Sequence, residues 1–275
     1  MKRLYRIPLE RRGAALLEML IALAITGVVT MAIMKLYLTQ HENYLTQDDI
    51  TTIQQNARAS IDELTRQIRM AGNELPAGLK AITAANTNPD TITISYKAGN
   101  CDTYLASAMP LPSAELKTAV GLDITCFHDG QWVYIYDPDS GGGEWFEITE
   151  VQGPAYHIQH NTMALSRAYD ANAILLALTQ MKFFIDNTTD PDHPCLMVQP
   201  IGHNPQVYAE DVVDLQFRYR LANGMLVDEP ILVNDIHEVI ITVTARSDDP
   251  DPDKPGDPYR TRLYTSSVSL RNLGV

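Results

Sequence analysis

The chain has 275 residues, 45% of them hydrophobic, and its 34 acidic residues outnumber 21 Lys and Arg, which gives a formal net charge of −13 at pH 7. A chain this rich in apolar residues can bury a core, which argues against disorder over most of its length. The acidic balance disfavours direct binding of nucleic acid, because that binding draws its affinity from clustered cations. Three cysteines are too few for a disulfide-stapled scaffold.

The first 34 residues divide into a basic segment and an apolar one. Residues 1–13 contain one acidic residue, Glu10, and the basic residues Lys2, Arg3, Arg6, Arg11 and Arg12. The apolar segment Ala14–Met34 follows, with Glu18 as its one charged residue. About 20 apolar residues cross a bilayer as a helix, and basic residues before the span hold that end in the cytoplasm. We therefore predict a transmembrane helix, with the remaining chain in the periplasm of a bacterium.

This apolar segment is unlike an ordinary secretory signal peptide. Signal peptides have a shorter apolar run that ends in small residues at the cleavage site, whereas Lys35, Leu36 and Tyr37 follow here. We expect the segment to remain in the mature protein. A plain single-pass anchor is the simplest interpretation, but an ionisable Glu18 within a span costs a few kcal/mol and usually persists only for a function.

The residues RRG-AALLE, which contain Gly13 and Glu18, resemble the class III leader of type IV prepilins. The resemblance implies cleavage between Gly13 and Ala14 by a prepilin peptidase, N-methylation of Ala14, and a role for Glu18 in subunit assembly. In an apolar bundle of helices, a carboxylate and a neighbour's α-ammonium are each costly alone and much less so when paired. Ala14 and Ala15 depart from the common Phe and Thr of this motif.

Residues 35–72 are predicted to form an amphipathic stem helix that continues the apolar one. Neither glycine nor proline interrupts it before Gly72. Its apolar positions follow helical spacing, at Ile50, Ile53, Ala57, Ile61, Leu64, Ile68 and Ala71. On the opposite face, Asp62 and Arg66 are spaced to form an ion pair. The alternative is two helices, broken in the polar stretch 39–49.

The end of this helix and the tail of the chain also resemble one group within the pilin family. Residues 56–74 resemble the helix end of PilW-type minor pilins, with matches at Arg58, Leu64, Arg66, Ile68, Arg69, Ala71 and Gly72. The stretches 212–219, 238–247 and 267–273 then follow in the order and approximate spacing seen in PilW-like proteins, whose final strand ends in L-R-N. Lys35 occupies the position where major pilins commonly have proline, which favours a minor pilin or a pseudopilin.

Residues 73–275 are predicted to form a β-rich globular head, because the apolar period shortens to that of strands after Gly72. The predicted strands are 91–96, 131–136, 144–151, 155–159, 174–185, 195–198, 212–219, 239–245 and 259–270. Strands that follow one long helix favour the α+β class. We expect a pilin-like arrangement, with one antiparallel sheet packed on the stem.

The three cysteines leave two alternatives open. Cys101 and Cys126 lie 25 positions apart in the head, and an extracytoplasmic location would permit a disulfide between them. Otherwise all three cysteines, Cys195 included, would be small buried apolar side chains. The bridge near the C-terminus that many pilins have is missing, because no cysteine follows Cys195.

The sequence offers weak metal candidates. Clustered aspartates in the run 248–257 could hold Ca²⁺, but an EF-hand-like loop would need glycine where Lys254 stands, so a solvated hairpin loop is the favoured interpretation. The pairs His157/His160 and His193/Cys195 lack a second ligand pair at a metal-site spacing. We predict no metal and no cofactor.

No phosphate-binding loop and no nucleophile elbow occur in the sequence, so we predict that the protein is not an enzyme. The resemblance implies a structural minor pilin, made in the inner membrane and carried to the pilus and the cell surface. Its partners would be prepilin peptidase, other minor and major pilins, and basic surfaces such as that of a tip adhesin. Two alternatives share the same start: a type II secretion pseudopilin of the J type, and a membrane-anchored periplasmic binding domain.

Overall fold

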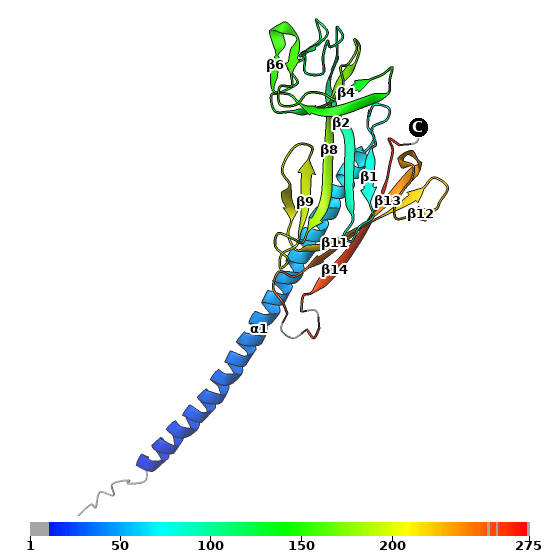
Figure 1. Cartoon of the computed structure of the whole chain (residues 1–275). Helices are drawn as coiled ribbons and strands as arrows, with labels where there is room; N and C mark the ends of the chain where they lie inside the picture. Colours follow the sequence, from blue (N-terminus) through cyan, green and yellow to red (C-terminus); the bar gives the residue numbers. More distant parts are fainter. Residues whose placement is uncertain (1–10, 252–253, 257, 274–275) are drawn as a thin grey trace, which may run out of the picture. The chain divides into compact units, whose positions relative to one another are not determined.

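The computed structural model describes residues 11–251, 254–256 and 258–273, without the side chains of residues 11–14. One long helix comes first and antiparallel strands follow, an α+β arrangement (Figure 1). The chain divides into two compact units, Met1–Thr51 and Thr52–Val275. The α+β prediction is therefore confirmed.

The helix α1 runs without a break from Arg11 to Met70. The polar stretch 39–49 is helical throughout, so the two-helix alternative is wrong. No helix-breaking residue occurs in that stretch, and the local propensities alone permit the helix to continue.

Within the second unit, the last turns of α1 bury the predicted apolar stripe. Five of its residues are at most 1% exposed, namely Ile53, Ala57, Leu64, Ile68 and Ala71. Ile50 and Ile61 are only partly buried. The predicted ion pair is wrong: Arg66 pairs with Glu63, Nη2 to Oε1 at 2.6 Å. Glu63 also accepts a hydrogen bond from Gln67, so this longer carboxylate takes the place expected for Asp62.

The end of α1 is closed by the tail of the chain. Gly72 follows the helix with φ of +83°, a left-handed conformation that suits glycine. Asn272 donates its side-chain amide to the carbonyl oxygens of Arg69 and Ala71, each at 3.4 Å. The last carbonyls of a helix lack intrahelical partners. The L-R-N segment of the tail therefore acts as a cap for the stem helix.

The strands form three antiparallel sheets. The largest has seven strands, with β1 (Ile82–Ala85), β2 (Thr91–Tyr104), β8 (Ile174–Asp186), β4 (Trp132–Asp137) and β5 (Gly142–Glu147) in that order, while β9 (Cys195–Pro200) pairs with β8 and β10 (Gln206–Ala209) with β9. The four-stranded sheet has the order β12 (Leu226–Val227), β11 (Val212–Leu221), β13 (Ile236–Arg246) and β14 (Thr261–Ser269). The three-stranded sheet contains β3 (Leu116–Lys117), β7 (His157–Gln159) and β6 (Glu150–Gln152).

Three sheets replace the single sheet that we expected. The predicted strand 144–151 is in fact two strands in different sheets, β5 and β6, because the chain turns at Ile148 and Thr149. The predicted strand 155–159 begins within a short 3₁₀ helix, Gly153–Ala155, before β7. A second 3₁₀ helix, Val233–Asp235, precedes β13. A pattern of alternating apolar residues marks a strand but does not say which sheet it joins.

Two main clusters of buried side chains fill the second unit. The helix-side cluster joins the α1 stripe to β1, β2, β11 and β13, and it includes Ile92, Phe183 and Ile241. The second cluster lies under β4, β5 and β7, and it includes Phe127 and Phe146. Strand β8 contributes buried side chains to both clusters (Figure 1).

Candidate functional site

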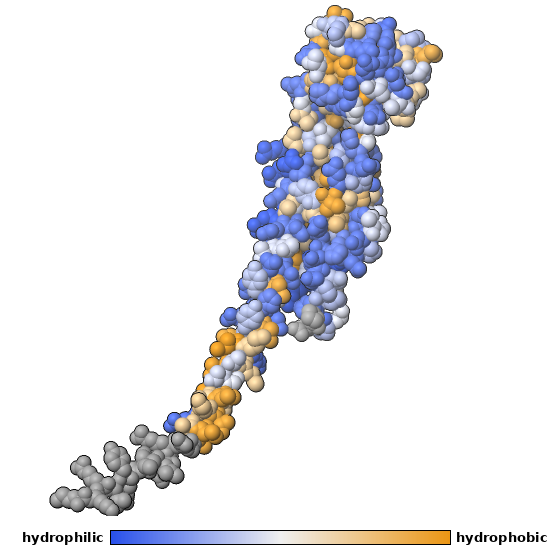
Figure 2. Space-filling view, turned by 90° about the vertical axis from the view of Figure 1, so that its left-hand side faces the viewer, coloured by the Kyte–Doolittle hydropathy of each residue, from blue (hydrophilic) through white to orange (hydrophobic). Residues whose placement is uncertain are grey.

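The first unit presents an apolar helix surface that nothing in the described chain covers. Its large hydrophobic side chains from Leu16 to Leu38 are 49% to 76% exposed. The apolar stretch of this helix contains no buried residue. Figure 2 shows hydrophobic residues over most of the visible face of this segment. By length and composition, α1 can cross a membrane.

The polar side chains of this apolar segment are satisfied within the helix, with one exception. Thr26 and Thr30 donate their hydroxyl groups to the carbonyl oxygens four residues earlier, at 2.8 and 2.7 Å. Such bonds let a hydroxyl group lie in an apolar environment at little cost. Glu18 is exposed and makes no hydrogen bond or ion pair within the described part of the chain. Glu18 is thus a charged group of this apolar segment without a partner among the described residues.

The predicted processing site lies at the start of this helix. Gly13 and Ala14 belong to the first described turn of α1. The basic residues before position 11 lie outside the described residues, and the side chains of Arg11 and Arg12 are not described. The leader 1–13 and the methylation of Ala14 stay predictions.

The head contains the disulfide that the sequence left open. Cys101 and Cys126 are bonded, and Cys195 is a free, partly buried thiol. The bridge ties the end of β2 to the loop before β4, beside the second cluster. Closing a loop of this length constrains the unfolded chain and stabilises the head by about 3 kcal/mol in the chain-entropy model.

The histidines singled out in the sequence have different surroundings. His160 is buried, with its ring nitrogens 3.1 and 2.7 Å from the carbonyl oxygens of Met163 and Ala114. His157 lies 3.4 Å from a carboxylate oxygen of Glu115. These two histidines therefore face different protein groups.

His193 lies in a cluster that the sequence analysis missed. Its Nδ1 is 3.4 Å from an oxygen of Asp211 and 3.0 Å from an oxygen of Asp248. The three residues come from three separate loops, so no local spacing pattern could have indicated the cluster. The acidic residues near His193 in the sequence were the one local feature that could have indicated this cluster.

The pKa values of this cluster reflect burial and charge. Burial raises the pKa of the Asp211 carboxyl, and the charge of Asp248 adds to that effect. Desolvation opposes protonation of His193, but the hydrogen bond and charge of Asp211, with the charge of Asp248, raise its pKa overall. Burial also raises the pKa of the Cys195 thiol.

The acidic run 248–257 is divided among different partners. Asp248 turns to His193, and Asp251 pairs with Arg260 at 2.6 Å. Asp253 and Asp257 lie outside the described residues. These two described carboxylates therefore point to separate partners, an arrangement that does not favour the loop as a calcium site of its own.

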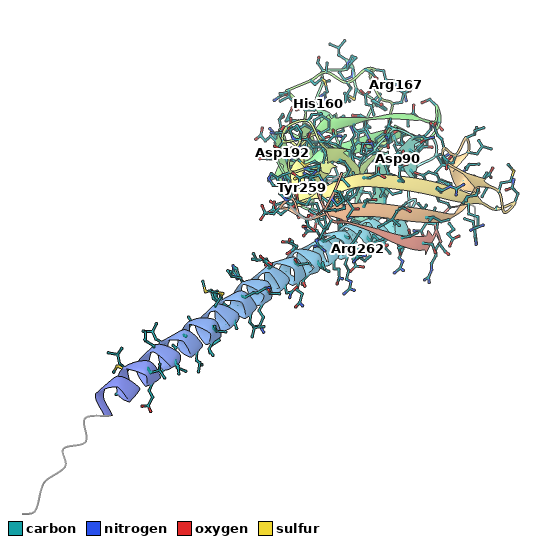
Figure 3. All side chains as sticks on the ribbon, turned by 90° about the horizontal axis from the view of Figure 1, so that it is seen from below. Asp90, His160, Arg167, Asp192, Tyr259 and Arg262 are labelled. Atoms are coloured by element: carbon teal, nitrogen blue, oxygen red, sulfur yellow. A yellow bond between two sulfur atoms is a disulfide. The ribbon has the colours of Figure 1, made fainter. Side chains whose placement is uncertain are left out.

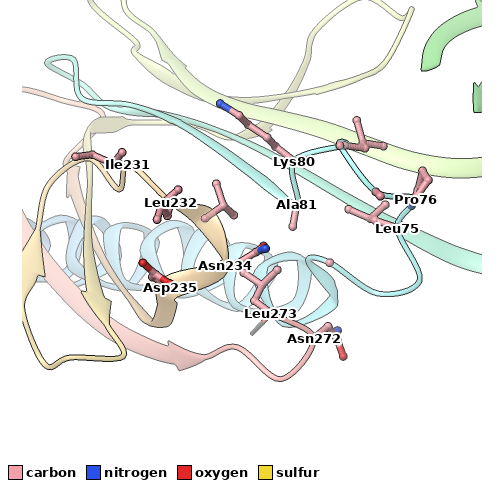
Figure 4. Close-up of a pocket in the computed structure, with 15 residues that line it drawn as sticks. Leu75, Pro76, Lys80, Ala81, Ile231, Leu232, Asn234, Asp235, Asn272 and Leu273 are labelled. Carbon is pink, nitrogen blue, oxygen red and sulfur yellow. The ribbon is translucent and has the colours of Figure 1, made fainter. Parts of the chain in front are cut away.

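A cavity of about 660 Å³ lies beside the capped end of α1 (Figure 4). It is lined by the loop after the helix, by Ile231–Asp235 and by Asn272 and Leu273. Lys80 and Asp235 are the ionisable residues among the lining that the structure describes. This lining offers no nucleophile with an adjacent base, so the cavity does not suggest catalysis.

No protein-family model, curated protein or solved structure matches the chain. The resemblance to type IV pilins therefore depends on the leader, stem and tail residues of the chain itself.

Proposed function

We propose that this chain is a minor pilin of the PilW type. It is inserted in the bacterial inner membrane as a prepilin with its head in the periplasm, is cut between Gly13 and Ala14, and joins a type IV pilus or its priming complex. The observation that carries the proposal is Glu18, a carboxylate without a partner among the described residues, on an exposed apolar helix and five residues after Gly13.

The exposed surface of the helix supports an assembly role. A large apolar surface is stable in a lipid bilayer or against other apolar helices, and not in water. Glu18 is costly in either environment unless it meets a cation. A neighbouring subunit cut after Gly13 would offer the α-ammonium of its own Ala14. Pairing of these two groups would set the axial register between subunits.

The head would supply contacts with other subunits. Within the second unit, its strands pack on the last turns of α1, and Asn272 caps the end of that helix. The acidic surface of the chain is suited to basic surfaces on other minor pilins, on major pilins or on a tip adhesin.

The variant Glu18→Gln tests this assembly role. It removes the charge and keeps the shape of the side chain, so the variant should enter the membrane as well as the wild type. We expect its amount in the sheared surface fraction to fall by at least tenfold, measured by immunoblotting in cells that lack the wild-type copy.

The matched control is Glu42→Gln, which removes an exposed carboxylate of the same helix outside the apolar segment. It should reach the surface fraction at the wild-type level. Wild-type amounts of Glu18→Gln in surface filaments would contradict the proposal. If both variants are lost from the surface alike, Glu18 has no special part in assembly.

A further inference from the structure

The cluster of His193, Asp211 and Asp248 lies in a cavity of about 490 Å³ at one end of the two larger sheets. His193 is in the loop between β8 and β9, Asp211 is in the turn between β10 and β11, and Asp248 follows β13. Backbone hydrogen bonds hold these loops together: Val212 donates to the Pro194 carbonyl at 3.0 Å, and Arg246 donates to the Asp211 carbonyl at 2.9 Å. The side chains thus meet on a fixed backbone.

Two of the three distances between the side chains are close to those in the coordination shell of a small divalent metal ion. One ligand atom from each residue lies within 4.8 Å of the others. The Nδ1 atom of His193 is 3.4 Å from Asp211 and 3.0 Å from Asp248. A tetrahedral zinc site with bonds of about 2.0–2.1 Å separates neighbouring ligand atoms by about 3.3 Å. A metal ion could therefore enter with little movement of the side chains.

The lining of the cavity also has an excess of negative charge, which a bound cation would compensate. Five carboxylates line it, from Asp186, Asp190, Glu210, Asp211 and Asp248, and its described lining contains neither Lys nor Arg. The side chain of Asp211 is 7% exposed. Burying a carboxylate among others is costly unless a cation compensates it, and a half-exposed histidine supplies at most one positive charge.

The guanidinium group of Arg246 is near the cluster but contacts other residues. Arg246 lies over the ring of Tyr259, 3.8 Å from its centroid, and donates to the carbonyl oxygen of Asp192. Figure 3 labels Asp192 and Tyr259, the two residues that this guanidinium contacts. Its charge lowers the pKa of Asp211 only as the last of several influences. Arg246 thus borders the cluster without filling the cavity.

Two other carboxylates of the lining, Asp186 and Asp190, accept hydrogen bonds within their own loop. Asp186 accepts hydrogen bonds from the backbone and hydroxyl groups of Thr188 and Thr189, which hold its pKa well below the usual range. Asp190 accepts a bond from the backbone of Asp192. These two groups shape their loop, whereas the ligand atoms of His193, Asp211 and Asp248 lie together.

We propose that His193, Asp211 and Asp248 bind one divalent transition-metal ion, of which Zn²⁺ is the representative. The imidazole selects against Ca²⁺ and Mg²⁺, which prefer oxygen ligands alone, and two carboxylates with one imidazole suit zinc. The open cavity leaves a fourth position for water. The ion would tie together three loops from both larger sheets, a structural role that is independent of the proposed pilin function.

Zinc titration of the full chain tests this proposal, with protein purified in mild detergent without a histidine tag. We expect one Zn²⁺ per chain by calorimetry, at least tenfold weaker binding in His193→Gln and in Asp248→Asn, and a tetrahedral absorption spectrum with Co²⁺. Both of these side chains are about half exposed, so the variants should fold, which circular dichroism checks. Asp211→Asn is the third variant, informative if it folds.

The matched controls are His203→Gln and Asp249→Asn, which remove an exposed histidine and the carboxylate next to Asp248. They should bind Zn²⁺ as the wild type does. Three results would overturn the proposal: no stoichiometric zinc binding, equal loss in the controls, or tighter binding of Ca²⁺ than of Zn²⁺. In the first case, the cluster is a protonated histidine held between two carboxylates.

Discussion

The two parts of α1 differ in where their partners lie. Residues 52–70 are amphipathic, and their apolar stripe is buried against strands of the same chain. Residues 15–38 are mostly apolar, and their large hydrophobic side chains are exposed. One part of the helix therefore completes the fold of this chain, whereas the other presents a surface for a bilayer or for other helices. The same element would join folding to the assembly that we propose.

The comparison predicts that matched substitutions in the two parts have different effects on the stability of the head. The largest difference is expected for leucine. Leu64→Ala removes a fully buried side chain from the helix-side cluster, and should destabilise the head by about 2–5 kcal/mol. Leu23→Ala, at a position 73% exposed, should leave that stability unchanged. Urea unfolding of the full chain in detergent, followed by near-UV circular dichroism, measures both.

A smaller difference in the stability of the head is expected between two glycine substitutions, Gly72→Ala and Gly27→Ala. Gly72→Ala would place a Cβ 2.6 Å from Leu273 at a φ of +83°, so it should cost about 1–3 kcal/mol and loosen the cap at Asn272. A Cβ added at Gly27 would meet nothing within 4 Å, so Gly27→Ala should not change the unfolding of the head. The same denaturation experiment distinguishes them, and equal effects would argue against the cap.

The smallest difference in the stability of the head is expected between two tyrosine substitutions, Tyr96→Phe and Tyr44→Phe. Tyr96 donates its hydroxyl group to the side-chain oxygen of buried Gln67 at 2.8 Å. Tyr96→Phe leaves that oxygen without this donor and should cost about 1–2 kcal/mol. Tyr44→Phe, at a position 66% exposed, is the control. A shift in the urea midpoint for Tyr96→Phe alone is expected, and no shift for either variant would mean that the buried bond contributes nothing net.

The sequence predicted the parts of the fold that depend on local periodicity. The stripe from Ile53 to Ala71 and the stop at Gly72 follow from helical spacing and from the backbone freedom of glycine. The pairing of Arg66 was wrong because two acidic neighbours, Asp62 and Glu63, compete for it, and side-chain reach decides between them. The strand 144–151 was wrong because sheet membership is a long-range property.

The candidate sites also differ in whether a local sequence pattern can indicate them. Glu18 stands out in the sequence because a charge interrupts an apolar run, and that contrast is local. The cluster around His193 needs contacts between residues 193, 211 and 248, which only the packing of the two larger sheets brings about. The role of Asn272 as a helix cap was equally hidden, since its partners lie about 200 positions earlier.

Mass spectrometry of the mature N-terminal peptide tests the central claim most directly. The peptide would be taken from membranes and from a sheared surface fraction of cells with active prepilin peptidase. The assembly proposal predicts a chain that begins at Ala14, with or without a methyl group, in both fractions. A processed chain found in membranes alone would favour the J-type pseudopilin. An intact segment 1–13 would contradict the proposal and leave a simple anchored domain.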